Sequence, residues 1–436
     1  MLDKIFSKIE RFVPEKWRWI LNHDGFKRYF ANTGWMFFGQ MFSLLVSFFI
    51  GAWLARYLGP TKYGIFSYAI AFTGLFSFIA SLGVDGILSR ELVDKSDNKD
   101  KLLGTGFIIE LVGGLLAFLI VFISSFVFED RALVRQLIII YSLIFIISPI
   151  NIINVFFQSQ VKAKINSKIK IYTLVISSVL KILLILLGGG VIWLTWIFFF
   201  DFLFNCIFLV YYYTKTGFNI FSWKYDYKLA KKILSGSLFL ILAMAANYIF
   251  LRADQVMIGA MLGEREVGLY AVAVKFVEVW YFIPVIICSS LFPAIINSKK
   301  INELVYRKRL KGFFIMLFLI GIFISIFTAI ISPLVIKIIF GIDYLESINI
   351  AVIYAWSNIG LFLGWGMYHY FLSENKLKNI FYFYFVSMVM NIFLNFILIN
   401  KMGLTGAAYS TLISYSIPPL FVFIFNKFKY DAKNIG

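Results

Sequence analysis

The sequence predicts an all-α integral membrane protein with about twelve transmembrane helices in two six-helix halves. Three observations predict this fold. The 436 residues are 61% hydrophobic and only 15% charged, whereas soluble domains are about 45–50% apolar and about 25% charged. Uncharged runs long enough to cross the hydrocarbon core, roughly 20 residues of helix, recur along the whole chain. A pattern of glycines also repeats between the two halves.

Twelve spans are expected, and all of them are expected to be helices. A lipid-exposed backbone must satisfy its own hydrogen bonds, and the apolar runs are too long for barrel strands. Three runs are interrupted by one charge each, which is Glu110, Lys181 or Asp201. The spans lie at about 29–55, 63–84, 103–128, 136–161, 169–187, 191–213, 233–262, 267–298, 312–336, 347–373, 379–400 and 402–426.

The spans divide the chain into five parts. Residues 29–214 and 233–426 are the two six-helix bundles, joined by a cytoplasmic linker at 215–232. Residues 1–28 form a basic N-terminal segment, either an interfacial helix or a solvated tail. Residues 427–436 form a cytoplasmic tail.

The basic residues indicate the orientation of the spans. The net charge of +18 would suggest a nucleic-acid partner in a soluble protein. Here 31 of the 41 Lys and Arg residues fall on the side that carries both termini, and only 7 fall in the loops of the other side. We therefore expect a protein of the cytoplasmic membrane with both termini in the cytoplasm. We expect no nucleic-acid partner.

Several chemistries find no support in the sequence. No phosphate-binding GxxxxGK[ST] motif occurs, which argues against an ATP-driven pump. The loops on the outer side are too short for the domain that a membrane-embedded glycan-assembly enzyme normally carries. The two cysteines and two histidines form no cluster. We expect no enzyme activity and no cofactor.

A short internal repeat connects the two halves. Gly59 and Gly64 follow the first span, and Gly263 and Gly268 follow the seventh at a constant offset of 204 residues. Two glycines five residues apart are typical of a tight turn that leads directly into a helix. Since the match follows spans 1 and 7, the halves are predicted to share one orientation, as in some secondary transporters.

The sequence resembles the polysaccharide (O-antigen type) flippases of the multidrug/oligosaccharidyl-lipid/polysaccharide exporter superfamily over nearly its whole length. None of the shared motifs is a catalytic signature, and their value lies in occurring together and in order. They are Leu54–Pro60 with Tyr63-Gly64, Gly83–Gly86 with Arg90–Leu92, Arg252–Gln255, Leu262-Gly263 with Val267–Tyr270, Leu291–Pro293, Asn391 with Asn395, and Met402–Ala408.

The resemblance implies two bundles in a V around a central cavity that opens alternately to either side. The implied cargo is a polyprenyl-diphosphate-linked oligosaccharide, moved to the outer leaflet for surface polysaccharide biosynthesis. Membrane lipids and other polysaccharide-assembly proteins are the implied partners, and a proton or sodium gradient is a candidate driving force. A multidrug or cation exporter of the same fold is the alternative; basic residues inside the membrane argue weakly against it.

Four charges in the second half are expected at one depth. These are Arg252 and Asp254 of span 7 with Lys275 and Glu278 of span 8. In one interpretation they neutralise one another and lock the two spans together. In the other, Arg252 or Lys275 faces the cavity and binds diphosphate, while Asp254 and Glu278 modulate binding or accept protons.

The remaining candidates are spread over both halves. Lys181 and Asp201 are expected to form an ion pair, with Lys181 also a cavity candidate and Asp201, like Asp85, also a coupling candidate. Glu110 has no partner within its own helix and is the best candidate for a coupling carboxylate.

Two further groups have both a structural and a functional interpretation. Asp85 and Arg90, with Arg28, either form a mouth that receives diphosphate or serve topology alone. Asn391 and Asn395 lie one helical turn apart and either hold helices together or bind sugar.

Overall fold

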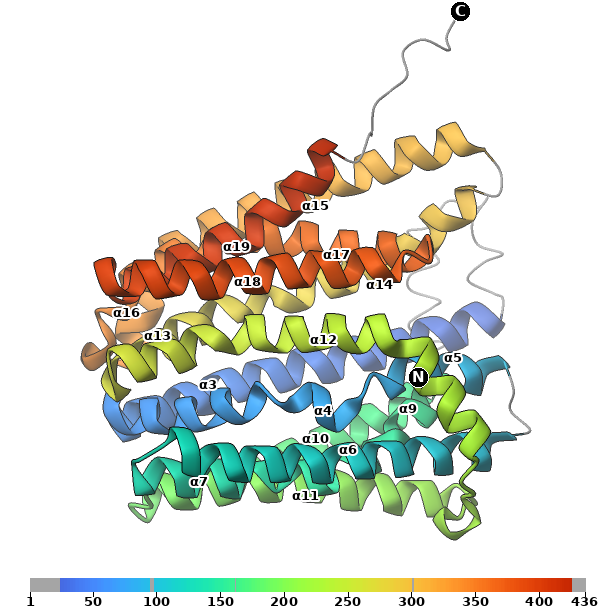
Figure 1. Cartoon of the computed structure of the whole chain (residues 1–436), viewed down its shortest axis with the longest axis horizontal. Coiled ribbons are helices and arrows are strands. Elements are labelled where there is room, and N and C mark those ends of the chain that lie inside the picture. The colour runs from blue at the N-terminus through green and yellow to red at the C-terminus, as the bar shows by residue number, and fades with distance from the viewer. Residues whose placement is uncertain (1–23, 95–97, 161, 300–301, 426–436) are drawn as a thin grey trace, which may run out of the picture.

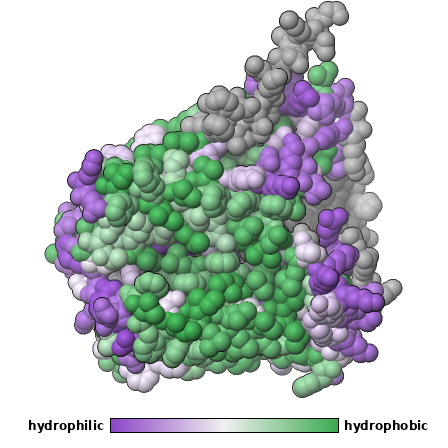
Figure 2. All heavy atoms as spheres, in the orientation of Figure 1, coloured by the Kyte–Doolittle hydropathy of each residue, from purple (hydrophilic) through white to green (hydrophobic). Residues whose placement is uncertain are grey.

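The computed structural model describes residues 24–94, 98–160, 162–299 and 302–425. The regular structure in these ranges is entirely helical. The predicted tail at 427–436 and most of the predicted segment at 1–28 lie outside the described residues. Figure 2 shows a broad apolar band between two polar ends, as a multi-pass membrane protein requires.

The helices of the first half follow one another up and down the molecule (Figure 1). They are α3 (Asp24–Gly74), α4 (Ser77–Ser81), α5 (Val84–Asp94), α6 (Lys99–Phe128), α7 (Ala132–Ser142), α8 (Ile144–Ile147), the 3₁₀ turn η3 (Ser148–Asn151), α9 (Ile152–Ser159), α10 (Ala163–Leu186) and α11 (Val191–Lys215).

A short connection leads into the second half. Its elements are η4 (Ile220–Ser222), α12 (Tyr227–Met261), α13 (Glu264–Glu278), η5 (Val279–Tyr281), α14 (Phe282–Lys299), α15 (Glu303–Val335), the π-helical turn η6 (Ile336–Phe340), η7 (Ile342–Tyr344), α16 (Ser347–Ala355), α17 (Ser357–Ser373), α18 (Leu377–Met402) and α19 (Leu404–Phe425).

In the described part of the chain, nine helices are long and apolar enough to cross a membrane, or ten if α16 and α17 count as one bent span. Twelve spans therefore remain a prediction. One reason for the difference is that α3 contains two helical segments on either side of Gly59, where the backbone is not helical.

The segment predicted as a linker at 215–232 includes the start of α12. Residues 227–232 already belong to α12, because the side chain of Asp226 accepts a hydrogen bond from the Leu229 amide at 3.1 Å and caps this helix. The backbone amide of Asp226 in turn donates to Thr105 on α6 at 3.0 Å. The linker is thereby attached to the first half.

The internal repeat is present in the backbone. Gly59 has φ 71° and Gly263 has φ 121°, a region that favours glycine. Each of them joins two helical segments. The following spans also break at equivalent places, since the helix is interrupted after Gly74 in the first half and at Val279–Tyr281 in the second, again 204 residues apart.

The two repeated turns pack directly on each other. A Cβ on Gly64 would lie 1.7 Å from the carbonyl oxygen of Glu264, and a Cβ on Gly268 would lie 2.0 Å from that of Pro60. These contacts are symmetric, because Pro60 and Glu264 are themselves equivalent in the repeat. The halves therefore meet backbone to backbone at this end, which we call the closed end.

The largest hydrophobic cluster shows that the halves are most extensively joined there. One large cluster includes buried residues of both halves, such as Phe66 and Val272. Two smaller clusters each centre on one half, around Phe156 in the first and Phe314 in the second. In Figure 1 α13 meets α3 at the left, and α14 and α15 diverge from the first half toward the right, where α12 stays on it. We call the right-hand end, which carries Lys232 and Lys299, the basic end.

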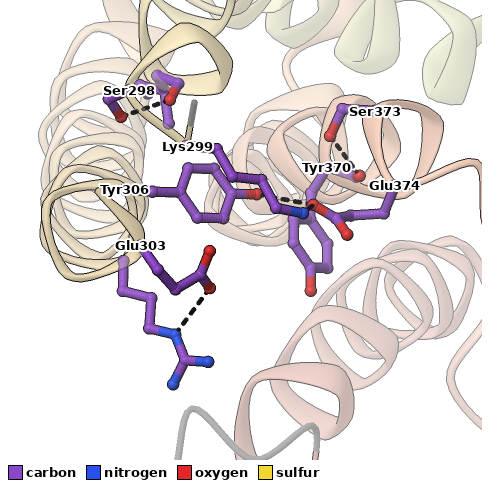
Figure 3. Close-up of polar contacts among 9 residues, drawn as sticks. Ser298, Lys299, Glu303, Tyr306, Tyr370, Ser373 and Glu374 are labelled. Atoms are coloured by element: carbon purple, nitrogen blue, oxygen red, sulfur yellow. Dashed lines mark hydrogen bonds and ion pairs between the residues drawn. The ribbon is translucent and has the colours of Figure 1, made fainter. Parts of the chain in front are cut away.

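Polar contacts hold the second half together at the basic end (Figure 3). Lys299 Nζ of α14 lies 2.6 Å from Glu374 Oε1 beyond α17, and Tyr306 of α15 donates to the same oxygen at 3.1 Å. The hydrogen bond from Lys299 lowers the pKa of Glu374 below its usual value. These contacts tie α14, α15 and the end of α17 together, while α12 is tied to the first half at this end by the ion pair of Lys232 with Glu91 at 3.1 Å.

Candidate functional site

Two adjoining cavities lie between α3, α10 and α11. The larger has a volume of about 750 Å³ and is lined by residues of the first half. The smaller, of about 330 Å³, is closed by Lys275, Glu278 and Val279 from the second half. Both are lined by Ser47, Phe198 and Asp201. They therefore form one polar space that reaches the interface between the halves.

Four charged residues surround the smaller cavity. Lys181 Nζ lies 3.4 Å from Asp201 Oδ2, so the predicted ion pair is confirmed. The same ammonium group lies 4.2 Å from the ring centroid of Phe198, within the range of a cation–π interaction. Lys275 and Glu278 complete the set. The cavity combines two cationic and two acidic groups in a region largely shielded from water.

Lys275 reaches from α13 across to the first half. A Cβ on Gly51 of α3 would lie 1.8 Å from Lys275 Nζ, so the ammonium group occupies the space that the glycine leaves open. No carboxylate of the described residues lies within ion-pair distance of it, including Glu278 one turn away. Its charge is therefore available to an anion.

Arg252 also contacts a glycine of the first half, in this case Gly74. Its Cγ and Nε lie 3.2 and 3.4 Å from the position of a Cβ on Gly74, where span 2 is interrupted. Glu278 lies within electrostatic range of both Arg252 and Lys275, yet neither forms an ion pair with it in the described part of the chain. Both cations of the second half thus contact the first half.

Asp254 does not belong to this group of charges. It is buried and accepts hydrogen bonds from Tyr270 at 2.7 Å, from Asn395 at 2.6 Å and from Thr411. The interpretation in which Arg252, Asp254, Lys275 and Glu278 neutralise one another is therefore not what the structure shows. The rotation of α12 places Arg252 and Asp254, two residues apart, on different sides of the helix.

Asn391 and Asn395 face this buried carboxylate rather than either cavity. Both are fully buried, and Asn395 Nδ2 donates to Asn391 Oδ1 at 3.0 Å. The cluster of Asp254, Tyr270, Asn391, Asn395 and Thr411, which we call the Asp254 cluster, connects α12, α13, α18 and α19. This arrangement matches the predicted role of the two asparagines in holding helices together.

Glu110 has an acidic neighbour that its own helix does not supply. Its side chain is 5% exposed, and Oε1 has no hydrogen-bond partner among the described residues. The Glu110 carboxyl group interacts with that of Asp85 on α5. Asp85 therefore pairs with another acid, and the predicted diphosphate-receiving mouth of Asp85 and Arg90 is not purely basic. Arg90 is exposed on the same helix as Asp85. The side chain of Arg28 lies outside the described residues.

Two groups of residues were not identified from the sequence. The first group is the polar lining of the larger cavity, and the spacing of these residues on two of its helices is the signal that would have found them. Gln40, Ser43 and Ser47 share one face of α3, and Asn166, Lys170 and Thr173 share one face of α10. The second group lies at the closed end, where Arg131 binds Glu129 at 2.6 Å and Glu264 of the other half at 3.2 Å.

Comparison with known proteins agrees with this architecture. Residues 29–299, more than half of the chain, match the family described as polysaccharide biosynthesis protein. The chain belongs to that family. A Shigella flexneri relative named for O-antigen transport is 23% identical over 409 residues, which cover 87% of this chain and 93% of the relative.

Solved structures show how widely the family's fold is shared. The lipid II flippase MurJ in an inward closed conformation aligns with a TM-score of 0.68 at 17% identity, over 90% of this chain and 87% of MurJ. An inward-facing multidrug resistance MATE transporter aligns with a TM-score of 0.66 at 15% identity, over 88% of this chain and 93% of that one. This member of the polysaccharide biosynthesis family therefore has the fold of both.

Proposed function

We propose that the protein moves a polyprenyl-diphosphate-linked oligosaccharide from the inner to the outer leaflet of the cytoplasmic membrane. The observation that carries this proposal is the pair Lys275 and Arg252, two cations at the interface of the halves without an ion-pair partner in the described residues. A diphosphate crosses hydrocarbon at great cost unless cations replace its hydration. The names of the Shigella relative and of MurJ support the same cargo class.

The two ends of the molecule suggest how the cargo moves. With both termini in the cytoplasm, the basic end faces the inner leaflet and the closed end faces outward. The halves join at the closed end. At the basic end α12 stays on the first half, whereas α14 and α15 diverge from it in the view of Figure 1. This arrangement favours the entry of cargo from inside. Alternating access then requires the closed end to open and the basic end to close.

We infer that the Asp254 cluster couples this cycle to a proton or sodium gradient. Asp254 is a buried carboxylate that accepts hydrogen bonds from the hydroxyl groups of Tyr270 and Thr411 and from the amide nitrogen of Asn395. Asn395 Oδ1 has no hydrogen-bond partner among the described residues. Carboxylate, carbonyl and hydroxyl oxygens suit a hard cation, and a proton on Asp254 would satisfy the same need.

Enzyme activity and drug export are less well supported as functions than transport of a lipid-linked oligosaccharide. The mechanism proposed here makes and breaks no covalent bond. The fold alone is shared with multidrug transporters, so it does not choose between cargoes. A drug exporter would be expected to use an acidic and apolar cavity, whereas the smaller cavity here contains Lys181 and Lys275.

Replacement of the two interface cations tests the proposal. In cells that depend on this protein, Lys275→Ala and Arg252→Ala are expected to abolish surface polysaccharide while protein abundance in the membrane is unchanged. Lys401→Ala is the matched control, because Lys401 is exposed at the end of α18. Normal polysaccharide in both Lys275→Ala and Arg252→Ala cells would contradict the proposed function.

A further inference from the structure

The larger cavity differs in chemistry from the smaller one. It is formed within the first half and has a volume in the range typical of ligand pockets. Half of its lining residues have neutral polar side chains. Five side-chain amides line it, and they belong to Gln40, Asn154, Gln158, Asn166 and Asn205. Amides and hydroxyls both donate and accept hydrogen bonds, as sugar hydroxyl groups also do.

The charged groups of this cavity already have partners. Lys170 Nζ donates to Gln40 Oε1 at 2.6 Å, and Asp201 is paired with Lys181. The cavity therefore has one cationic and one acidic residue, each engaged by a protein group. What remains to contact a ligand is uncharged.

Several of the neutral groups have no partner. The residues Ser43 and Thr173 are only 5% and 6% exposed. Their hydroxyl oxygens are buried, and neither makes a hydrogen bond with the described residues. Asn166 Oδ1 is in the same state, although its Nδ2 donates to the Asn154 carbonyl at 3.1 Å. Buried polar groups are normally hydrogen-bonded. Three unpartnered groups from α3 and α10 in one cavity indicate a polar ligand.

We propose that the larger cavity is a binding site for the uncharged sugars of the cargo, with the diphosphate held next to it at Lys275. This inference rests on the proposed function. The shared lining of the two cavities, including Ser47 and Asp201, makes the sugar and diphosphate positions continuous. The sugar nearest the diphosphate is then a neutral one, because a carboxylated sugar would meet no free cation in this cavity.

Binding to the purified full chain in lipid nanodiscs separates the two sites. The first probe is the lipid-linked oligosaccharide fraction extracted from source cells that lack this protein. The second is undecaprenyl diphosphate, which has no sugar. Thr173→Val removes one hydroxyl and keeps the side-chain shape; it is expected to weaken binding of the first probe about fivefold and to leave the second unchanged.

Three further variants complete the design. Ser43→Ala tests the same pocket from α3, in case Thr173→Val does not fold. Thr195→Val is the matched control, since Thr195 is buried in the same half and bonds only to its own helix; it is expected to bind both probes normally. Lys275→Ala is expected to weaken both probes.

The outcomes distinguish the sugar site from the proposed function. Wild-type protein that binds neither probe overturns the proposed function and the sugar site with it. Both probes could bind the wild-type protein while Thr173→Val and Ser43→Ala leave binding of the first probe unchanged or weaken binding of both probes equally. The cavity would then hold only water, and the sugar site would be overturned while the proposed function stands. A negatively charged sugar next to the diphosphate, identified by mass spectrometry of the extracted fraction, also overturns it.

Discussion

Lys275 and Arg252 each lie over a glycine of the opposite half. This arrangement explains how long, charged side chains fit at a tightly packed helix interface, because Gly51 and Gly74 leave room that any other residue would fill. It also places both cations where the halves must separate during transport. A contact between the halves changes when the halves move relative to each other, whereas an ion pair within one half does not.

Gly51→Ala is expected to reduce surface polysaccharide severalfold with little change in protein abundance. The new Cβ would lie 1.8 Å from Lys275 Nζ and 2.7 Å from Cε, so the flexible end of the side chain must move from its present position. Gly312→Ala is the control, because a Cβ there meets nothing within 4 Å. Full activity of Gly51→Ala would show that the position of the ammonium group does not matter.

Asp254→Asn is expected to remove the dependence of transport on the driving gradient. The amide keeps a carbonyl oxygen for Asn395, and its NH2 group takes the place of the oxygen that accepts from Tyr270 and Thr411, whose hydroxyls can also accept. It has no charge to bind a cation or to be protonated. Transport into vesicles with an imposed proton or sodium gradient measures the effect. Glu110→Gln is the comparison, because it replaces the other buried candidate carboxylate, next to Asp85. A gradient response that disappears in Glu110→Gln and persists in Asp254→Asn would transfer the coupling role to the acid pair.

At the scale of elements, the repeat explains the contact between the halves. Gly59 and Gly263 provide positive φ at the turns, while Gly64 and Gly268 let the following helices touch through their backbones. The same offset of 204 residues relates the breaks in spans 2 and 8. The sequence repeat thus corresponds to one turn and one helix break that occur in both halves.

Gly268→Ala is expected to destabilise the protein by about 1–3 kcal/mol, the usual cost of overpacking. The added Cβ would lie 2.0 Å from a backbone oxygen, which moves less readily than a side chain. Thermal unfolding in nanodiscs measures the loss. Gly190→Ala is the control, since a Cβ there meets nothing within 4 Å and the backbone has negative φ. Equal melting temperatures for both variants would show that the closed end tolerates separation of the two turns.

At the scale of the whole molecule, a few polar contacts accompany the shared core at the closed end. Arg131 of the first half reaches Glu264 of the second, and Tyr344 of the second half donates to the Ala55 carbonyl of the first at 2.7 Å. Arg131 also lies 5.0 Å from the ring centroid of Tyr68. These contacts must break if the closed end opens.

Arg131→Gln is expected to shift the population toward an open outer end. Spin labels at Lys62→Cys and Lys337→Cys, both exposed, report the separation; the native cysteines Cys206 and Cys288 are buried and do not compete. Arg135→Gln is the control, because Arg135 contacts Phe126 within its own half. An unchanged distance distribution in Arg131→Gln would exclude the contact with Glu264 as a lock.

We expect the same distance to depend on pH through Glu129, whose carboxylate holds Arg131 at 2.6 Å. Burial alone would raise the pKa of Glu129, but hydrogen bonds from Arg131 outweigh it and hold the pKa below the ordinary value of 4.5. A carboxylate with a lowered pKa stabilises the folded contact above its unfolded value and loses that contribution as the pH falls through the folded pKa. Glu129 is therefore expected to hold Arg131 in position for Glu264 above about pH 4.5 and to release it only below that pH, which the spin-label distance would measure.

Some contacts were predictable from the sequence because depth alone determines them. Lys181 and Asp201 lie at similar depth on successive antiparallel helices, so their pairing followed from span boundaries. The repeat turns followed from residue identity and spacing. The partners of Asp254 and Glu110 did not, because a helix that is apolar on nearly all sides gives no periodic signal for its rotation. Asn395, Thr411 and Asp85 also lie far away along the chain or in other helices.

The sequence by itself determined that this is a helical multi-pass membrane protein with a repeated turn and basic residues gathered on one side. Those properties follow from composition, run length and local spacing, which the lipid environment enforces helix by helix. Only the tertiary structure decided which charges meet: that Asp254 turns away from Arg252, that Lys275 occupies the space above Gly51, and that neutral side chains from several helices line one cavity. Such contacts depend on the rotation and tilt of whole helices, which packing between them sets.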